Sequence, residues 1–97
     1  MLKLIVNRDL AHGVVVYFEG NTFDSKDTIK ALGYKFGIVG PKTWSKKIPS
    51  VNINMQPLLD ELKNVEKAFG DLPLCYLGHE MTLSVAIAGI KRSNHLN

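Results

Sequence analysis

The first twenty residues hold two runs with strand character, an alternating one and a continuously apolar one, and this pattern limits the folds open to the chain. Leu2, Leu4 and Val6 share one face of the first run, because successive side chains in a β-strand point to opposite sides. The second run, Val14–Glu19, is β-branched and aromatic, which favours a more deeply buried strand. A turn-like segment, 9–13, separates the runs. We therefore expect a β-hairpin.

Two helices are expected after the hairpin. The first runs from Asp24, as its N-cap, to about Leu32, and Gly33 ends it. The second spans about 57–69 and ends at Gly70. Its apolar residues recur at helical spacing: Leu58, Leu59, Leu62, Val65 and Phe69. Both helices need a sheet to pack against.

Further short strands are expected at 34–38, 44–48, 51–55, 74–77 and 81–91. The last segment also fits a helix, since Leu83, Ile87 and Ile90 follow i, i+4, i+7 spacing. Its Thr, Val and Ile content, together with Gly89, favours a strand. The sequence thus predicts a small α+β domain over residues 1–92, roughly ββαββαββ, with an antiparallel sheet packed against two helices and a flexible tail at 93–97.

Composition narrows the class of protein. With 97 residues, of which 45% are hydrophobic, the chain fits one domain with a small core. Its single cysteine cannot form an internal disulfide. The longest apolar runs, such as Val14–Phe18, are far shorter than the ~20 residues of a membrane span, and residues 1–8 lack a signal-peptide pattern. We expect a cytoplasmic protein without a membrane partner, associated with the nucleoid if it binds DNA.

Catalytic and metal chemistry find little support in the sequence. The histidines lie far apart on predicted turns or in the tail: His12, His79 and His95. Cys75 and His79 are loosely spaced for metal ligands, but a structural zinc site needs four ligands and no second pair is visible. Three carboxylates could suggest a nuclease, but helix capping and strand-end solvation explain them: Glu19, Asp24 and Asp27. We therefore expect no enzyme activity, no metal and no cofactor.

Charge is distributed unevenly along the chain. Twelve Lys and Arg against nine Asp and Glu give a net charge of +3. No acidic residue occurs between Asp27 and Asp60. Lysines neutralise phosphates and aromatic rings stack on bases, so the sequence predicts a nucleic-acid site with these residues: Lys30, Tyr34, Lys35, Lys42, Trp44, Lys46, Lys47, Lys91 and Arg92. The alternative is that the aromatic residues Tyr34, Phe36 and Trp44 face the core, while lysines on edge strands discourage aggregation.

Residues 20–44 carry a resemblance to a known module. The matching positions are Gly20-Asn21-Thr22-Phe23, Lys26, Ile29–Phe36 and Lys42-Thr43-Trp44. This pattern resembles small uncharacterised modules of bacterial, phage and archaeal DNA-metabolism proteins, and it is loosely similar to the HARP domain of annealing helicases. The chain has Phe36 where the pattern usually has Trp, and a longer loop at 37–41. The resemblance implies association with DNA replication or repair proteins and no enzymatic activity.

Three functions are therefore open. The leading hypothesis is a non-catalytic accessory factor that binds nucleic acid, by expectation DNA, in replication or repair. The second is an interaction subunit of a larger polymerase or helicase complex, using the apolar segments 51–55 and 81–90. The third is a viral or mobile-element inhibitor of a host protein. A second copy of the chain is a further candidate partner.

Overall fold

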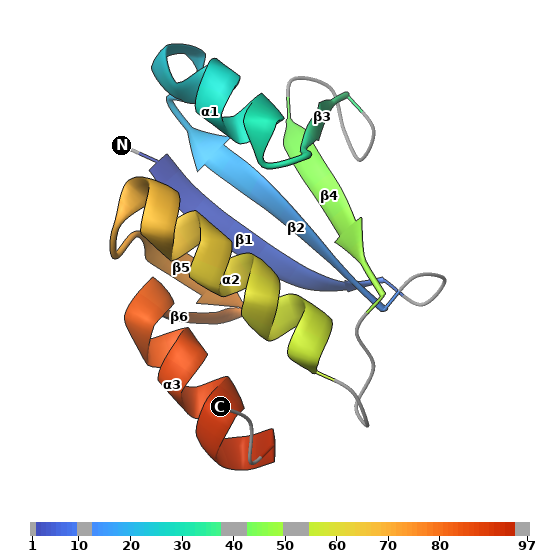
Figure 1. Cartoon of the computed structure of the whole chain (residues 1–97), viewed down its shortest axis with the longest axis vertical. Helices are drawn as coiled ribbons and strands as arrows, with labels where there is room; N and C mark the ends of the chain where they lie inside the picture. The colour runs from blue at the N-terminus through green and yellow to red at the C-terminus, as the bar shows by residue number, and fades with distance from the viewer. Residues whose placement is uncertain (1, 10–12, 38–42, 50–54, 95–97) are drawn as a thin grey trace.

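The computed structural model describes residues 2–9, 13–37, 43–49 and 55–94, which form one mixed β-sheet with three α-helices on the same side (Figure 1). The strand order is β3-β4-β2-β1-β5-β6. In chain order the elements are β1 (Leu2–Asp9), β2 (Gly13–Gly20), the 3-10 turn η1 (Phe23–Ser25), α1 (Lys26–Ala31), β3 (Lys35–Phe36), β4 (Trp44–Ile48), α2 (Gln56–Phe69), β5 (Pro73–Tyr76), β6 (His79–Thr82) and α3 (Leu83–Asn94). The α+β class is confirmed. The predicted strand at 51–55 lies outside the described residues except for Met55.

The expected N-terminal hairpin is present. β1 and β2 pair in antiparallel register from Leu2 opposite Gly20 to Asp9 opposite Gly13. Leu4 and Val6 are fully buried on the side of the sheet that faces the helices. The alternation read from the sequence therefore identifies the core face of β1 correctly.

The sheet is mixed, and the prediction of an antiparallel sheet is wrong for one pair of strands. β1 lies parallel to β5, with Leu4 opposite Leu74 and Val6 opposite Tyr76. The cause is helix α2, which connects β4 to β5 across the face of the sheet (Figure 1). Such a crossover returns the chain in the direction of the preceding strand, and β4 runs in the same direction as β1 because both are antiparallel to β2.

The first helix begins differently from the prediction. Asp24 is not its N-cap: the segment starts with the 3-10 turn η1, where the Asn21 side-chain oxygen accepts a hydrogen bond from the Phe23 N–H at 3.2 Å. Its end follows the prediction, since Gly33 has a φ of +97° and its N–H bonds to the Lys30 carbonyl. The next N–H, that of Tyr34, reaches the Ile29 carbonyl, which completes a Schellman motif. This motif turns the chain directly from α1 into β3.

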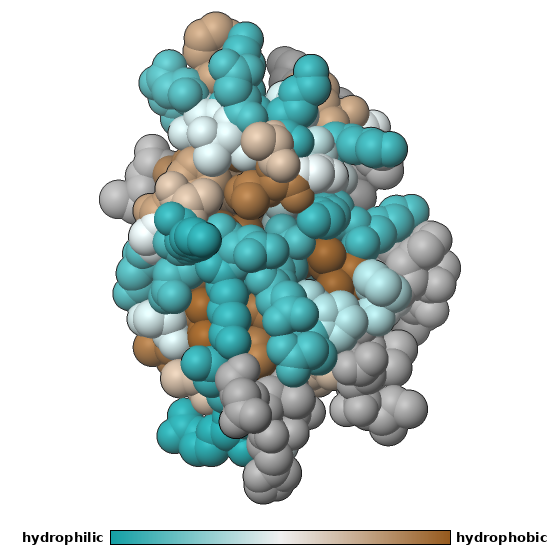
Figure 2. All heavy atoms as spheres, viewed as in Figure 1, coloured by the Kyte–Doolittle hydropathy of each residue, from teal (hydrophilic) through white to brown (hydrophobic). Residues whose placement is uncertain are grey.

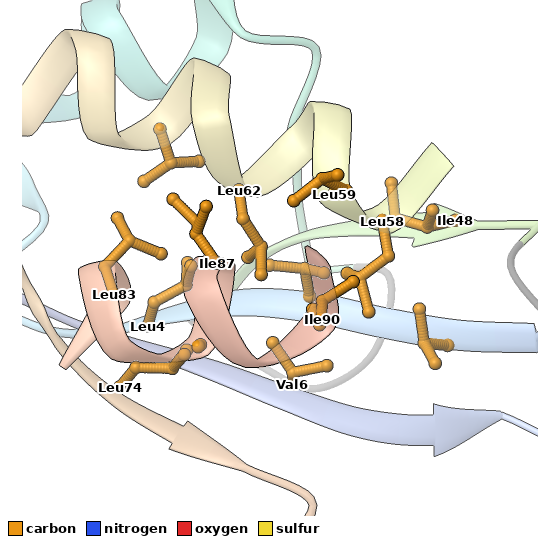
Figure 3. Packing of buried hydrophobic residues seen from close by; sticks show 14 of the residues in the cluster. Leu4, Val6, Ile48, Leu58, Leu59, Leu62, Leu74, Leu83, Ile87 and Ile90 are labelled. Atoms are coloured by element: carbon orange, nitrogen blue, oxygen red, sulfur yellow. The ribbon is translucent and has the colours of Figure 1, made fainter. Parts of the chain in front are cut away.

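The second helix was predicted within one residue of each end. Its apolar stripe is buried at Leu58, Leu59, Leu62 and Val65. Figure 3 shows these leucines packed between the sheet and α3, near Leu4, Val6 and Leu74. On the face drawn in Figure 2, hydrophilic side chains cover most of the outer side of α2. The helix thus covers the centre of the core.

The prediction of a strand over 81–91 is wrong: only His79–Thr82 is a strand, and α3 begins at Leu83. The start of α3 is fixed by Asp71, whose carboxylate accepts hydrogen bonds from the Ser84 N–H at 2.8 Å and the Ser84 hydroxyl at 2.9 Å. Leu83, Ile87 and Ile90 are buried, as the helical alternative required. The helix continues through Asn94 into the segment predicted as tail, and residues 95–97 lie outside the described chain. None of the described helices is long and apolar enough to cross a membrane.

Candidate nucleic-acid interface

The structure divides the predicted nucleic-acid residues between two distant parts of the sheet. Most of them lie on α1, β3 and β4, at one edge. Lys91 and Arg92 lie in the last turn of α3, which packs beside β5 and β6 at the other edge (Figure 1). Lys42 is outside the described residues. The nine predicted residues therefore do not form one surface, and the α1–β3–β4 edge is the candidate interface.

Tyr34 is not available for base stacking, which corrects the prediction for this residue. Its side chain is 2% exposed, and its ring meets the Phe18 ring edge-on at 4.9 Å between centroids. Burial, reinforced by the nearby Glu61 carboxylate, raises the pKa of the Tyr34 hydroxyl. Tyr34 belongs to the core, as the alternative interpretation of the aromatic residues proposed.

Lys46 has partners within the fold, and its predicted role as a phosphate contact stays a prediction. Its ammonium lies 2.8 Å from an oxygen of the buried Glu61 carboxylate on α2. It also donates a hydrogen bond to the Leu32 carbonyl at 3.0 Å, at the C-terminus of α1. A lysine suits this place because helix C-termini carry unpaired carbonyls and partial negative charge. Lys46 therefore joins β4 to α1 and α2.

The other aromatic residues form an open surface, which we call the aromatic groove. It has a volume of about 390 Å³ and is lined by Thr22, Phe23, Lys26, Phe36 and Trp44. The Phe36 and Trp44 rings meet edge-on at 5.2 Å on paired strands β3 and β4. Phe23 is 71% exposed and Phe36 52%. The Lys26 ammonium lies 4.6 Å from the centre of the Phe23 ring, within cation–π range.

Of the groove residues, the predicted site included only Trp44. Phe23 and Lys26 precede the acid-free stretch, so the charge pattern did not point to them. Phe36 lies beside the lysines in the sequence, but alternation alone does not show which face of its short strand meets solvent. The motif at 20–44 contains all of these residues. The spacing of this motif is the sequence signal that could have predicted the residues of the aromatic groove.

Free cations surround this edge of the sheet. Lys30 and Lys35 are exposed, and in the described part of the chain neither forms an ion pair. Lys30 lies one turn after Lys26 on α1, so the two share a side of the helix. The α1 side of the aromatic groove therefore carries two exposed lysines, with the carboxylates of Asp24 and Asp27 in the same segment.

A second hollow, which we call the edge hollow, lies on β4 close to the groove. It has a volume of about 310 Å³ and is lined by Gly33, Lys35, Ser45, Lys46 and Lys47. Ser45 and Lys35 are directly paired across β3 and β4. Trp44 and Ser45 are consecutive in the strand and point to opposite sides of the sheet. The aromatic groove and the edge hollow thus flank the same two strands.

A third hollow, the α3 groove, lies at the other edge of the sheet. Its volume is about 310 Å³, and its walls come from β5, β6 and α3: Tyr76, Met81, Val85, Ala86, Gly89, Ile90, Arg92 and Ser93. Val85 is 56% exposed. This surface is mainly apolar with one guanidinium at its rim, and it carries part of the segment that the sequence proposed for protein contacts.

The described part of the chain does not gather metal-ligating side chains. Across residues 2–9, 13–37, 43–49 and 55–94, no three His, Cys, Asp or Glu side chains come close enough to hold a metal ion. Cys75 lies half-buried on β5 as a free thiol. Its strand neighbour on β6 is Glu80, whose carboxylate pairs with Lys3 at 2.7 Å.

No family model, curated protein or solved structure matches the chain. The resemblance of residues 20–44 to HARP-like modules therefore stays a prediction, and the functional argument depends on the geometry of the aromatic groove and its lysines.

Proposed function

We propose that this chain is a small, non-catalytic accessory module of DNA replication or repair that holds a single DNA strand in the aromatic groove. Bases would stack on Trp44 and Phe36, while Lys26 and Lys30 would neutralise the adjacent phosphates. The module would act in the cytoplasm, at the nucleoid when it is bound to DNA.

The observation that carries this proposal is a groove lined by three aromatic rings, of which those of Phe23 and Phe36 are exposed and that of Trp44 is half-buried. Phe23, Phe36 and Trp44 line one groove, although the fold buries other large apolar side chains such as Phe18 completely. An exposed aromatic cluster on a small domain marks a binding surface. Stacking suits it, because every base has a π-face and each stacked base contributes about 1–3 kcal/mol.

The position of the lysines favours nucleic acid over an uncharged ligand. Lys26 lies in the groove and Lys30 one helical turn beyond it, and both are exposed. Single-strand binding loses about 0.7 units of log K per unit of log salt for each neutralised phosphate. Contacts from Lys26 and Lys30 would give a slope of about −1.4.

The test uses Trp44, which is the only tryptophan in the chain. Oligothymidylate is titrated at several salt concentrations, while tryptophan emission reports stacking directly. We expect saturable quenching with a salt slope of about −1.4. Binding without quenching would show that the DNA strand does not contact the aromatic groove. No binding at low salt would overturn the proposal.

A protein-binding role is the second candidate, and the α3 groove is the observation that favours it. The exposed Val85 side chain there lies among apolar neighbours, and α3 lies far from β3 and β4 (Figure 1). A nuclease-treated pull-down from the native extract separates the two functions. A partner that is lost with Val85→Lys but kept with Phe36→Ala supports this second role.

A further inference from the structure

The edge hollow exists because β3 is much shorter than β4. β3 pairs only with Trp44 and Ser45, so among the described residues the outer edge of β4 has no strand neighbour from Lys46 onward. Gly33 forms the opposite wall and adds no side chain. A Cβ there would lie 3.3 Å from the Lys46 ammonium. The hollow's volume of about 310 Å³ has room for a ligand of a few atoms.

A buried hydroxyl in the wall of this hollow lacks a partner. Ser45 is 3% exposed, and its Oγ has no hydrogen-bond partner within the described structure. Buried polar atoms are nearly always hydrogen-bonded, and an unmatched one destabilises the fold. The Oγ is covered, so a ligand oxygen that reaches it as neighbouring side chains shift would accept its hydrogen bond and remove this penalty.

Two unpaired ammonium groups lie on the same side of the sheet as Ser45. Lys35 is the strand partner of Ser45, and Lys47 follows two residues later on β4, which places its side chain on the same side. Both are exposed, and the described residues offer neither of them a carboxylate. Lys46 also lines the hollow, but Glu61 and the Leu32 carbonyl occupy its ammonium.

We infer that the edge hollow binds one phosphate group, with Ser45 donating a hydrogen bond and with Lys35 and Lys47 neutralising the charge. A hydroxyl donor between two ammonium groups matches a tetrahedral oxyanion. The phosphate could belong to a nucleic-acid backbone. This case rests on the proposed function and adds a defined phosphate position to it. It could equally belong to a free phosphate monoester, and the test separates these sources.

The test follows backbone amide resonances by NMR during titration with inorganic phosphate, thymidine monophosphate and oligothymidylate, against chloride at equal ionic strength. Saturable shifts at Lys35, Ser45 and Lys47 with phosphate, but not with chloride, are expected. Ser45→Ala should weaken phosphate binding about tenfold. The same variant should unfold at an equal or higher urea concentration, since it removes an unmatched hydroxyl.

Lys47→Gln, at an exposed position, should also weaken phosphate binding, whereas Lys67→Gln on the exposed end of α2 should leave it unchanged. Equal shifts with chloride, or full phosphate affinity in Ser45→Ala, would overturn the inference. If phosphate fails to bind while oligothymidylate still quenches Trp44, the edge hollow is refuted and the proposed function stands. If phosphate and thymidine monophosphate bind but the oligonucleotide does not, the hollow stands, the ligand is a free monoester, and the proposed function falls.

Discussion

The Lys46 ammonium and the Glu61 carboxylate meet at 2.8 Å and tie the edge strand pair β3–β4 to helix α2. The same ammonium donates a hydrogen bond to the carbonyl of Leu32, the C-cap of α1. The strands that carry the aromatic groove are therefore fixed to two helices by one lysine. Lys46 is therefore a structural lysine, whereas Lys30, Lys35 and Lys47 have no ion-pair partner among the described residues and can meet a ligand.

Lys46→Met should lower the free energy of unfolding by about 2–3 kcal/mol. The loss arises because Glu61, whose side chain is 6% exposed, keeps its charge without a partner. Urea denaturation measures it, with Lys47→Met as the matched control on the exposed side of β4. The control should change stability by less than about 0.5 kcal/mol. Equal stability of the two variants would contradict the structural role of Lys46.

Alkaline pH should destabilise the fold through Tyr34. Its pKa is raised by burial, so the folded state keeps the hydroxyl proton after the unfolded chain, with a pKa of about 10, has lost it. The stability is fully present below about pH 10 and falls as pH rises above it, by up to about 1.4 kcal/mol per pH unit. Half-buried Tyr76 acts in the same direction.

Tyr34→Phe should therefore flatten the loss of stability between pH 9 and 11, measured by urea denaturation at each pH. The wild type and the variant should respond equally to pH between 7 and 9. An unchanged slope above pH 10 in the variant would show that Tyr34 is not the group responsible.

Phe36→Ala should weaken single-strand binding about tenfold or more while leaving the fold intact, because its ring is largely exposed and stacking contributes about 1–3 kcal/mol per base. Val85→Ala is the control, since Val85 is about as exposed but lies in the α3 groove. Tryptophan quenching by oligothymidylate measures both variants. Equal affinities would exclude the aromatic groove as the binding surface.

Asp71→Ala should loosen the start of α3 and lower stability by about 1 kcal/mol, as expected for the loss of an N-terminal helix cap. Hydrogen exchange should quicken at Ser84, whose N–H bonds to Asp71. Asp71→Asn, which keeps an acceptor oxygen, should restore most of the protection. Unchanged exchange in Asp71→Ala would mean that packing alone sets the helix start.

The elements predicted well are those determined by neighbouring residues. The β1–β2 hairpin and α2 follow from the spacing of apolar side chains and from nearby turn residues such as Gly70, whose φ is +83°. α3 was missed because its first turn depends on Asp71, which lies 13 residues before Ser84. The parallel pairing of Leu4 with Leu74 depends on a whole crossover, which no local pattern specifies.

The candidate site was predicted only in part for a similar reason. Tyr34 and Phe36 alternate with Lys35 in the sequence and look equivalent, yet one ring is buried and the other is exposed. Tyr34 packs beside Phe18 in the core, whereas Phe36 lies on β3, the last strand of the sheet, and meets the half-buried Trp44. Lys46 and Lys47 are adjacent in the sequence but lie on opposite sides of β4, so only one of them reaches Glu61.

The parallel pairing of β1 with β5 also bears on how the chain matures during synthesis. β1 leaves the ribosome well before its partner, β5, which ends at Tyr76. At about 5–20 residues per second, β1 waits several seconds with one edge unpaired. In that interval one edge of β1 presents unpaired backbone groups to which a strand of another chain can pair. Chaperone contact or pausing after β4 would therefore govern the yield of folded protein.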